Sequence, residues 1–198
     1  MEIRKAEQSD IESIVKIHSD AFKDFFLTSL GPDFLRFYYI CFVNSNETVT
    51  MCAVEDGKIL GFAASTKVCK GFNSRLIKSN LVNFGMLSIK LLFTSPQSLI
   101  RLFKNLTKKS ETVEDNENYA ELYSIAISQD AQSKGVGKQL LTASEKIMKD
   151  EGVERVSLTT DYYNNEAAVG FYLSMGYETL YEFMTYPNRK MYRFIKSL

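Results

Sequence analysis

Gln132-Ser133-Lys134-Gly135-Val136-Gly137-Lys138 is the most informative stretch of this sequence. It follows a strand-like run, 120–127, and opens a helix-like run that ends near Glu151. The two glycines let the backbone turn tightly, so that N–H groups and the positive end of the helix dipole converge on one point. Lys134 and Lys138 would add full positive charges. The stretch therefore predicts a turn that binds a pyrophosphate group.

Two common phosphate-binding loops do not fit this turn. A Walker A loop needs glycine where Gln132 stands and a Ser or Thr directly after Lys138, and the chain has neither. The dinucleotide fingerprint needs a third glycine where Leu140 stands. What remains is Gln-x-x-Gly-x-Gly between a strand and a helix.

A second block follows the next expected strand, at residues 164–177. It places an Asn and an Ala three residues apart, then Phe171-Tyr172, then Gly176-Tyr177. Together the two blocks resemble motifs A and B of the GNAT superfamily of N-acetyltransferases. The resemblance implies that acetyl-coenzyme A is the co-substrate and that no metal is needed. It covers nearly the whole chain apart from residues 70–118.

The resemblance also implies which residues hold the coenzyme. The turn would bind its pyrophosphate through Gln132, Ser133, Lys134, Gly135, Val136, Gly137 and Lys138. The preceding strand would bind the pantetheine arm like an added strand through Ile125, Ala126 and Ile127. Asn165 would cap the following helix and hydrogen-bond the coenzyme.

Two side chains are candidates for proton transfer. The resemblance implies that Tyr172 faces the thioester sulfur and gives a proton to the departing thiolate. The strand Ala120-Glu121-Leu122-x-x-x-Ala126 resembles that of histone-type acetyltransferases, in which the Glu is the general base. Glu121 is therefore the candidate base for an amine that attacks the thioester directly in a ternary complex. A chain of waters is the alternative, with Glu121 an ordinary charge at the start of a strand.

Composition sets the class of protein. The chain has 198 residues, 45% of them hydrophobic, and its 24 basic residues equal its 24 acidic ones. This is expected of a single globular domain, 1–198, and nothing in the charge points to nucleic acid. The one histidine, His18, and three cysteines without Cys-x-x-Cys spacing predict core side chains and no zinc site. With no signal-peptide pattern at its start, the chain is expected to be cytoplasmic.

The order of elements agrees with the resemblance. A strand is expected near 2–6, a helix from a capping box at Ser9 and Glu12, and a second helix from Gly31-Pro32. Two strands, 49–55 and 58–68, flank the hairpin turn Asp56-Gly57. The fold class is α/β (α+β): a GNAT-like mixed, largely antiparallel sheet with helices on both faces and a helical insertion between strands 3 and 4.

The insertion is the least typical part. Residues 70–109 carry eight basic side chains and no acidic one, and Pro96 is expected to divide them into two amphipathic helices before an acidic, mobile linker at 111–117. One interpretation is a helical pair that packs on the domain or on a second subunit, giving a homodimer. The other is a basic surface for peripheral contact with anionic lipid, without stable insertion in a membrane, or for a phosphate-bearing substrate.

The acceptor is expected to be a small-molecule amine. The basic insertion favours an anionic one such as a nucleotide-linked amino sugar, while a polyamine, a drug-like amine and a protein amine stay open. O-acetylation and a catalytically silent module that only binds acyl-coenzyme A are further alternatives.

Overall fold

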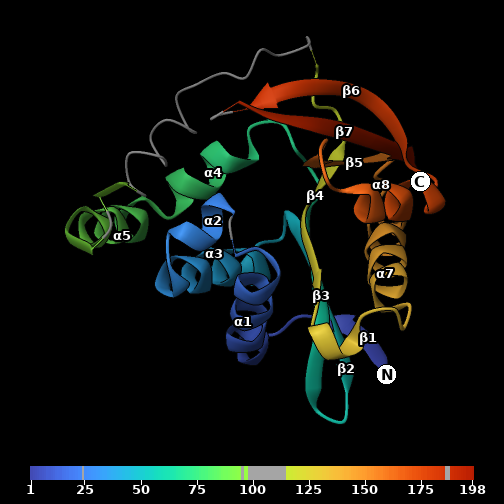
Figure 1. The fold of residues 1–198 in the computed structure, drawn as a ribbon. Coiled ribbons are helices and arrows are strands. Elements are labelled where there is room, and N and C mark those ends of the chain that lie inside the picture. The colour runs from blue at the N-terminus through green and yellow to red at the C-terminus, as the bar shows by residue number, and fades with distance from the viewer. Residues whose placement is uncertain (24, 95, 98–114, 186–187) are drawn as a thin grey trace.

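The computed structural model of the protein describes residues 1–198 except 24, 95, 98–114 and 186–187. In the described part, seven strands form one sheet in the order β1-β2-β3-β4-β5-β7-β6 (Figure 1). All neighbours are antiparallel except β4 and β5. The strands are β1 (Glu2–Lys5), β2 (Thr48–Glu55), β3 (Lys58–Thr66), β4 (Ala120–Ile127), β5 (Arg155–Asp161), β6 (Glu178–Thr185) and β7 (Arg189–Ser197).

Helices cover both faces of this sheet. One face carries α1 (Ile11–Ala21), α2 (Phe26–Ser29), α3 (Pro32–Asn44), α4 (Phe72–Ser79) and α5 (Leu81–Thr94), and the other carries α7 (Val136–Asp150) and α8 (Glu166–Ser174) (Figure 1). Each layer has its own apolar core, the first built around Tyr39, Phe42 and Phe62 and the second around Leu140 and Leu158. The expected fold class is confirmed.

The hairpin and the helix expected after Gly31-Pro32 form as the sequence predicts. Asp56 and Gly57 have φ of 49° and 73°, the left-handed conformations that a tight two-residue hairpin turn requires. Helix α3 begins at Pro32, where a missing N–H costs nothing. The three cysteines are buried thiols.

The first helix begins differently from the prediction. A short 3-10 turn, η1 (Gln8–Asp10), precedes α1, and the capping box joins Glu7 and Asp10 instead of Ser9 and Glu12. The carboxylate of Asp10 also receives two hydrogen bonds from Arg4. The charge-assisted hydrogen bonds to the buried carboxylate of Asp10 therefore outweigh the local preference for Ser9 as the cap.

The insertion contains a break that the sequence did not predict. Helices α4 and α5 meet at Asn80, where the chain bends by 88°. Helix α5 ends at Thr94, just before Pro96, where a boundary was predicted, and residues 96–97 are helical again. Within the described residues no single helix has the length and apolarity to span a membrane, although α4 and α5 pass that test as a bent pair. Residues 98–114, and with them most of the predicted linker, lie outside the described residues. Asp115 is anchored, because its carboxylate accepts hydrogen bonds from the hydroxyls of Tyr119 and Tyr181.

Candidate active site

Strands β4 and β5 pair only at their beginnings. Residues Ala120 to Leu122 lie opposite Val156 to Leu158, and beyond them the described strands separate. On its other side β4 stays paired with β3 as far as Ile127, with an irregularity between Ala64 and Ser65. The β5-facing edge of 123–127 therefore keeps backbone groups without a strand partner in the described structure. An extended ligand could bind there by strand addition.

Gly61 of β3 brings the two backbones close together here. A Cβ at this position would lie 2.6 Å from Ile127 Cδ1 and 2.8 Å from the carbonyl oxygen of Ala126. Only glycine fits without displacing β4, so Gly61 helps to set the position of the free edge.

The turn after β4 leaves a helix start open to an anion. Helix α7 begins at Val136, and Gly135 before it has a φ of 74°, the left-handed region that favours glycine. Among the described residues no side chain caps this end, and the first intrahelical bond there runs from Gln139 to Gly135. The N–H groups of residues 136–138 therefore point outward without intrahelical partners. Val136 itself is buried and anchors the turn to the core.

The remaining residues of the predicted turn surround this helix start. Gln132, Ser133, Lys134 and Lys138 are exposed, and Ser133 shares the left-handed conformation with a φ of 63°. Neither lysine forms an ion pair with a described residue, so both charges are available to a ligand. Open N–H groups and two lysines thus lie together at this helix start, and their use for pyrophosphate stays a prediction.

A cavity of about 300 Å³ lies where β4 and β5 separate. Its walls combine residues 122–125 of β4, 158–161 of β5 and the start of α8 with aromatic side chains of α1, α2 and the link between them. This volume lies at the small end of ligand sites. The cavity can therefore enclose the reacting groups, while the rest of a coenzyme would lie along β4 and the turn.

Tyr172 forms part of this cavity wall. Its side chain packs against Phe171, Tyr177 and Phe194, and the residue is 9% exposed. Burial raises the pKa of Tyr172 to about 12, so the hydroxyl keeps its proton at neutral pH. It can then serve as a proton donor, as the sequence predicts.

Glu121, the other predicted catalytic residue, lies outside this cavity. Its Oε1 accepts a hydrogen bond from Arg193 at 3.0 Å, and its Oε2 accepts one from the thiol of Cys69 at 2.9 Å. Arg193 also donates to Ser157. Glu121 is buried and does not line the cavity that Tyr172 lines. The structure therefore does not bring the two predicted catalytic residues together, and the base role of Glu121 stays a prediction.

Asn165 occupies the N-cap position of α8, but its side chain does not cap the helix. Instead its amide donates to the hydroxyl of Thr160 at 2.6 Å and to the carbonyl of Asp161 at 3.1 Å. The predicted cap is thus wrong. Asn165 holds the end of β5 against the start of α8 and lines the cavity.

Sequence reasoning missed an ion pair in the cavity wall. Asp161, the last residue of β5, is paired with Arg189, the first residue of β7, through both carboxylate oxygens. The guanidinium of Arg189 lies 4.5 Å from the ring centre of Phe25. The signal for Asp161 was its place at the carboxyl end of a strand beside the expected site. Arg189 carries no such signal.

His18 also lines the cavity, although the sequence identified it only as a core residue. It is 2% exposed, and its Nδ1 lies 2.6 Å from the hydroxyl of Tyr39. Its Nε2 is buried without a partner in the described part of the chain. Burial lowers the pKa of His18 to about 4, so the ring is neutral at pH 7. In the described residues no cluster of His, Cys, Asp and Glu could hold a metal ion.

The comparisons identify the family. The model of the acetyltransferase (GNAT) family matches residues 11–177, so the chain belongs to this family of N-acetyltransferases, which use acetyl-coenzyme A. No curated protein sequence matches the chain.

Solved structures share the fold at low sequence identity. A ribosomal-protein-alanine N-acetyltransferase from Brucella melitensis is 14% identical, with a TM-score of 0.64 and 100% of both chains covered. The PaiA N-acetyltransferase from Thermoplasma acidophilum, solved with coenzyme A, is 16% identical, with a TM-score of 0.60 and 100% and 98% covered. An aminoglycoside 6'-acetyltransferase type Ii is 14% identical, with a TM-score of 0.61 and 100% and 97% covered.

Proposed function

We propose that this N-acetyltransferase moves the acetyl group of acetyl-coenzyme A to a small primary amine, and that the amine is an amino sugar. The cavity carries the proposal, because the unpaired edge of β4, Tyr172 and the Asp161–Arg189 pair all line it. The coenzyme would enter along β4, and the acceptor would enter from the side of α1 and α2.

The coenzyme would be held by backbone groups. The pantetheine arm would pair with 125–127, and the pyrophosphate would accept hydrogen bonds from the N–H groups of 136–138, with Lys134 and Lys138 beside it. The N–H near Ile127 would bind the oxyanion that forms when the amine attacks the thioester. No protein nucleophile takes part.

The proton transfers divide between Tyr172 and water. As the C–S bond breaks, the Tyr172 hydroxyl would give its proton to the thiolate. The amine of an ordinary acceptor has a pKa near ~10 and must lose a proton before attack. A water chain would carry that proton away, because Glu121 does not line the cavity. The Glu121→Gln variant should then keep the pH profile of the wild type.

The cavity wall supports the acceptor class. Phe22, Phe25 and Phe26 supply an apolar surface on which one face of a sugar ring could stack. Asp161 could accept hydrogen bonds from an ammonium or hydroxyl group, and Arg189 could bind an anionic substituent. The basic insertion gives no direct support, because no described residue of α4 or α5 lines the cavity. The aminoglycoside enzyme and the ribosomal-protein enzyme share the fold equally well, so the fold does not choose between sugar and protein amines.

A thiol-release assay tests the acceptor. Acetyl-coenzyme A would be offered with free amino sugars, nucleotide-linked amino sugars, polyamines and a peptide with a free N-terminus. Turnover highest on amino sugars is the expected result. Turnover of polyamines or peptide alone would overturn the sugar assignment, and coenzyme binding without turnover of any amine would favour a silent binding module.

A further inference from the structure

The buried ring of His18 has one nitrogen with a hydrogen-bond partner and one without. Its Nδ1 lies 2.6 Å from the hydroxyl of Tyr39, and the side chain of Tyr39 also hydrogen-bonds that of Ser124 on β4. Its Nε2 is buried and has no partner in the described part of the chain. A buried polar atom without a hydrogen bond is costly and rare in folded proteins, so Nε2 calls for a ligand that the chain itself does not supply.

The orientation of the ring places Nε2 at the cavity. His18 lines the cavity together with Phe22 and Ser124, whereas Tyr39 does not line it. The Nδ1 side of the ring is therefore turned away from the cavity, and the rest of the ring, which carries Nε2, borders it. The ring centre of Phe22 lies 4.8 Å from that of His18, and the ring centre of Phe62 lies 6.5 Å from it. These contacts hold the ring in place.

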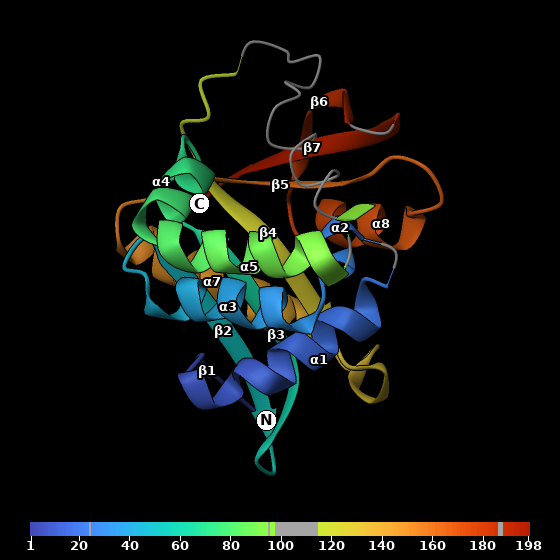
Figure 2. The same cartoon turned by 90° about the vertical axis from the view of Figure 1, so that its left-hand side faces the viewer.

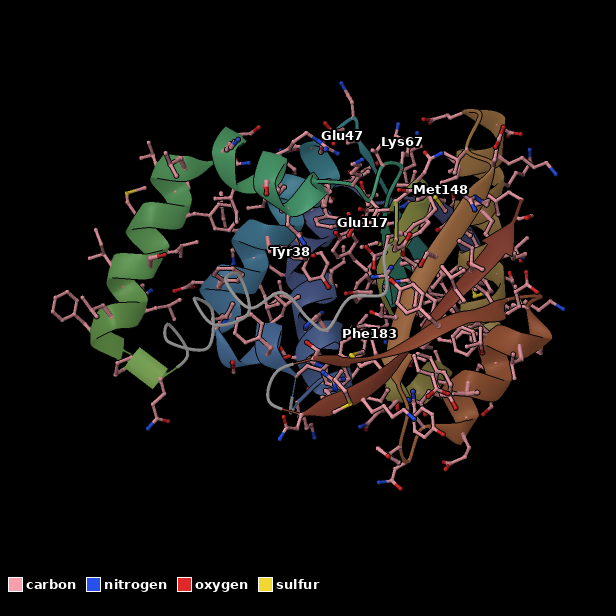
Figure 3. The ribbon with its side chains drawn as sticks, turned by 90° about the horizontal axis from the view of Figure 1, so that it is seen from above. Tyr38, Glu47, Lys67, Glu117, Met148 and Phe183 are labelled. Atoms are coloured by element: carbon pink, nitrogen blue, oxygen red, sulfur yellow. The ribbon has the colours of Figure 1, made fainter. Side chains whose placement is uncertain are left out.

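His18 belongs to the side of the sheet from which the acceptor would enter. Helices α1 and α3 lie in front of β2 and β3 in Figure 2, and Figure 3 shows the labelled Tyr38 of α3 and Met148 of α7 on opposite sides of the sheet. The cavity reaches both sides, because its walls include His18 of α1 and Tyr172 of α8. If the coenzyme approaches from the side of α7 and α8, the amine meets the wall that contains His18.

A nucleophilic amine must be held without the use of its lone pair. The lone pair attacks the thioester, so only the N–H groups of the amine remain for hydrogen bonds, and the protein has to supply acceptors. A neutral imidazole has one acceptor nitrogen. In His18 this acceptor is Nε2 when Nδ1–H donates to Tyr39 and the Tyr39 hydroxyl donates to Ser124. Burial lowers the pKa of His18 to about 4, which keeps the ring neutral at pH 7.

We propose that Nε2 of His18 accepts a hydrogen bond from an N–H group of the acceptor amine and so directs the lone pair of the amine at the thioester. The proton that the amine loses leaves through water, as above. This inference rests on the proposed use of the cavity by both substrates, but not on the amine being that of a sugar.

NMR tests the proposal directly, because His18 is the only histidine in the chain. In protein with isotopically labelled histidine and no tag, the long-range proton–nitrogen spectrum at pH 7 should show a protonated Nδ1 and an unprotonated Nε2. With coenzyme A present, methylamine should shift the Nε2 resonance more than the Nδ1 resonance. Tetramethylammonium has no N–H group and should not. A protonated Nε2, no response to methylamine, or an equal response to both cations would overturn the proposal.

Two substitutions separate the two ring nitrogens. The amide atoms of Asn lie two bonds from Cβ, as Nδ1 does in His, and those of Gln lie three bonds from Cβ, as Nε2 does. His18→Asn should lower kcat/KM for the amine by roughly 3- to 10-fold, the effect of one lost neutral hydrogen bond, with the KM for acetyl-coenzyme A unchanged. His18→Gln should recover most of this loss. Equal losses in the two variants, or an equal rise in the KM for acetyl-coenzyme A, would reduce His18 to a structural residue.

The choice of amine keeps this test separate from that of the acceptor. The variants are assayed with the amine that turns over fastest in the thiol-release panel, so a wrong sugar assignment changes the amine but not the expected order of the variants. If no amine in the panel turns over, the acceptor proposal fails, whereas the methylamine measurement still decides the role of Nε2.

Discussion

Acid should destabilise this protein through the histidine in the cavity wall. Burial lowers the pKa of His18 from its ordinary 6.5 to about 4, while its Nδ1 stays bonded to Tyr39. Between these two pKa values the unfolded chain binds a proton that the folded chain does not bind. The stability that the neutral ring provides is therefore complete above pH 6.5 and is lost as the pH falls toward 4.

The magnitude follows from the two pKa values. The full loss is about 3 kcal/mol, and about 2 kcal/mol of it falls between pH 7 and pH 5. Asp10 and Asp115 also have lowered pKa values. For Asp10 the main cause is its hydrogen bonds from Arg4. Burial raises the pKa of Asp115, but the hydrogen bonds from Tyr119 and its neighbours together lower it by more. Their contributions are lost only below their ordinary value of 3.8, outside this interval.

Urea unfolding of the wild type and of His18→Gln at pH 7 and pH 5 measures this effect. The variant cannot titrate at this position and keeps a polar group near Tyr39. The wild type should lose about 2 kcal/mol more than the variant between the two pH values. Equal losses in both proteins would refute the argument that His18 is buried in its neutral form.

Three further changes test the site. Tyr172→Phe should lower turnover by roughly tenfold or more without changing coenzyme affinity, and the exposed control Tyr163→Phe should not; normal turnover would remove the proton-donor role. Gly61→Ala should destabilise the fold by about 1–3 kcal/mol in urea and weaken coenzyme binding, because its Cβ would press on the carbonyl of Ala126; an unchanged midpoint would contradict the close approach. Arg193→Met should cost about 3–5 kcal/mol of stability at pH 7 by leaving a buried carboxylate unpaired, and a smaller loss would mean that water reaches it.

The fold was predictable because its signals are local. The glycine turn before α7, the hairpin at Asp56-Gly57 and the block around Phe171-Tyr172 each act through backbone geometry within a few residues. The parallel pairing of β4 and β5 then follows from the helix between them.

The predictions of the helix caps and of the insertion differ from the structure where contacts with distant residues compete with local preference. Asp10 forms its capping box because Arg4 on β1 binds its carboxylate, and Asn165 turns from the helix start to Thr160. The additional break in the insertion, at Asn80, precedes the contacts of Phe84 with Phe34 and Phe37 of α3. No local pattern reports such contacts.

For the same reason, the residues that line the cavity could not be predicted from the sequence. His18, Asp161 and Arg189 come from α1, β5 and β7, and only the folded sheet brings them together. Glu121 shows the reverse case, since its place on β4 was predicted but its partners Arg193 and Cys69 were not. A motif gives the position of a side chain, whereas its role depends on what the other strands place beside it.

Thermal unfolding with acetyl-coenzyme A, with ATP and NAD as controls, tests the central claim that the β4 edge and the α7 turn form one coenzyme site. At ~100 times its dissociation constant the coenzyme should stabilise the fold by about 2.7 kcal/mol, which raises the melting temperature by roughly 5–10 °C for a chain of this size. ATP and NAD lack the pantetheine arm and should give a much smaller shift. No shift with acetyl-coenzyme A, or an equal shift with all three, would contradict the account.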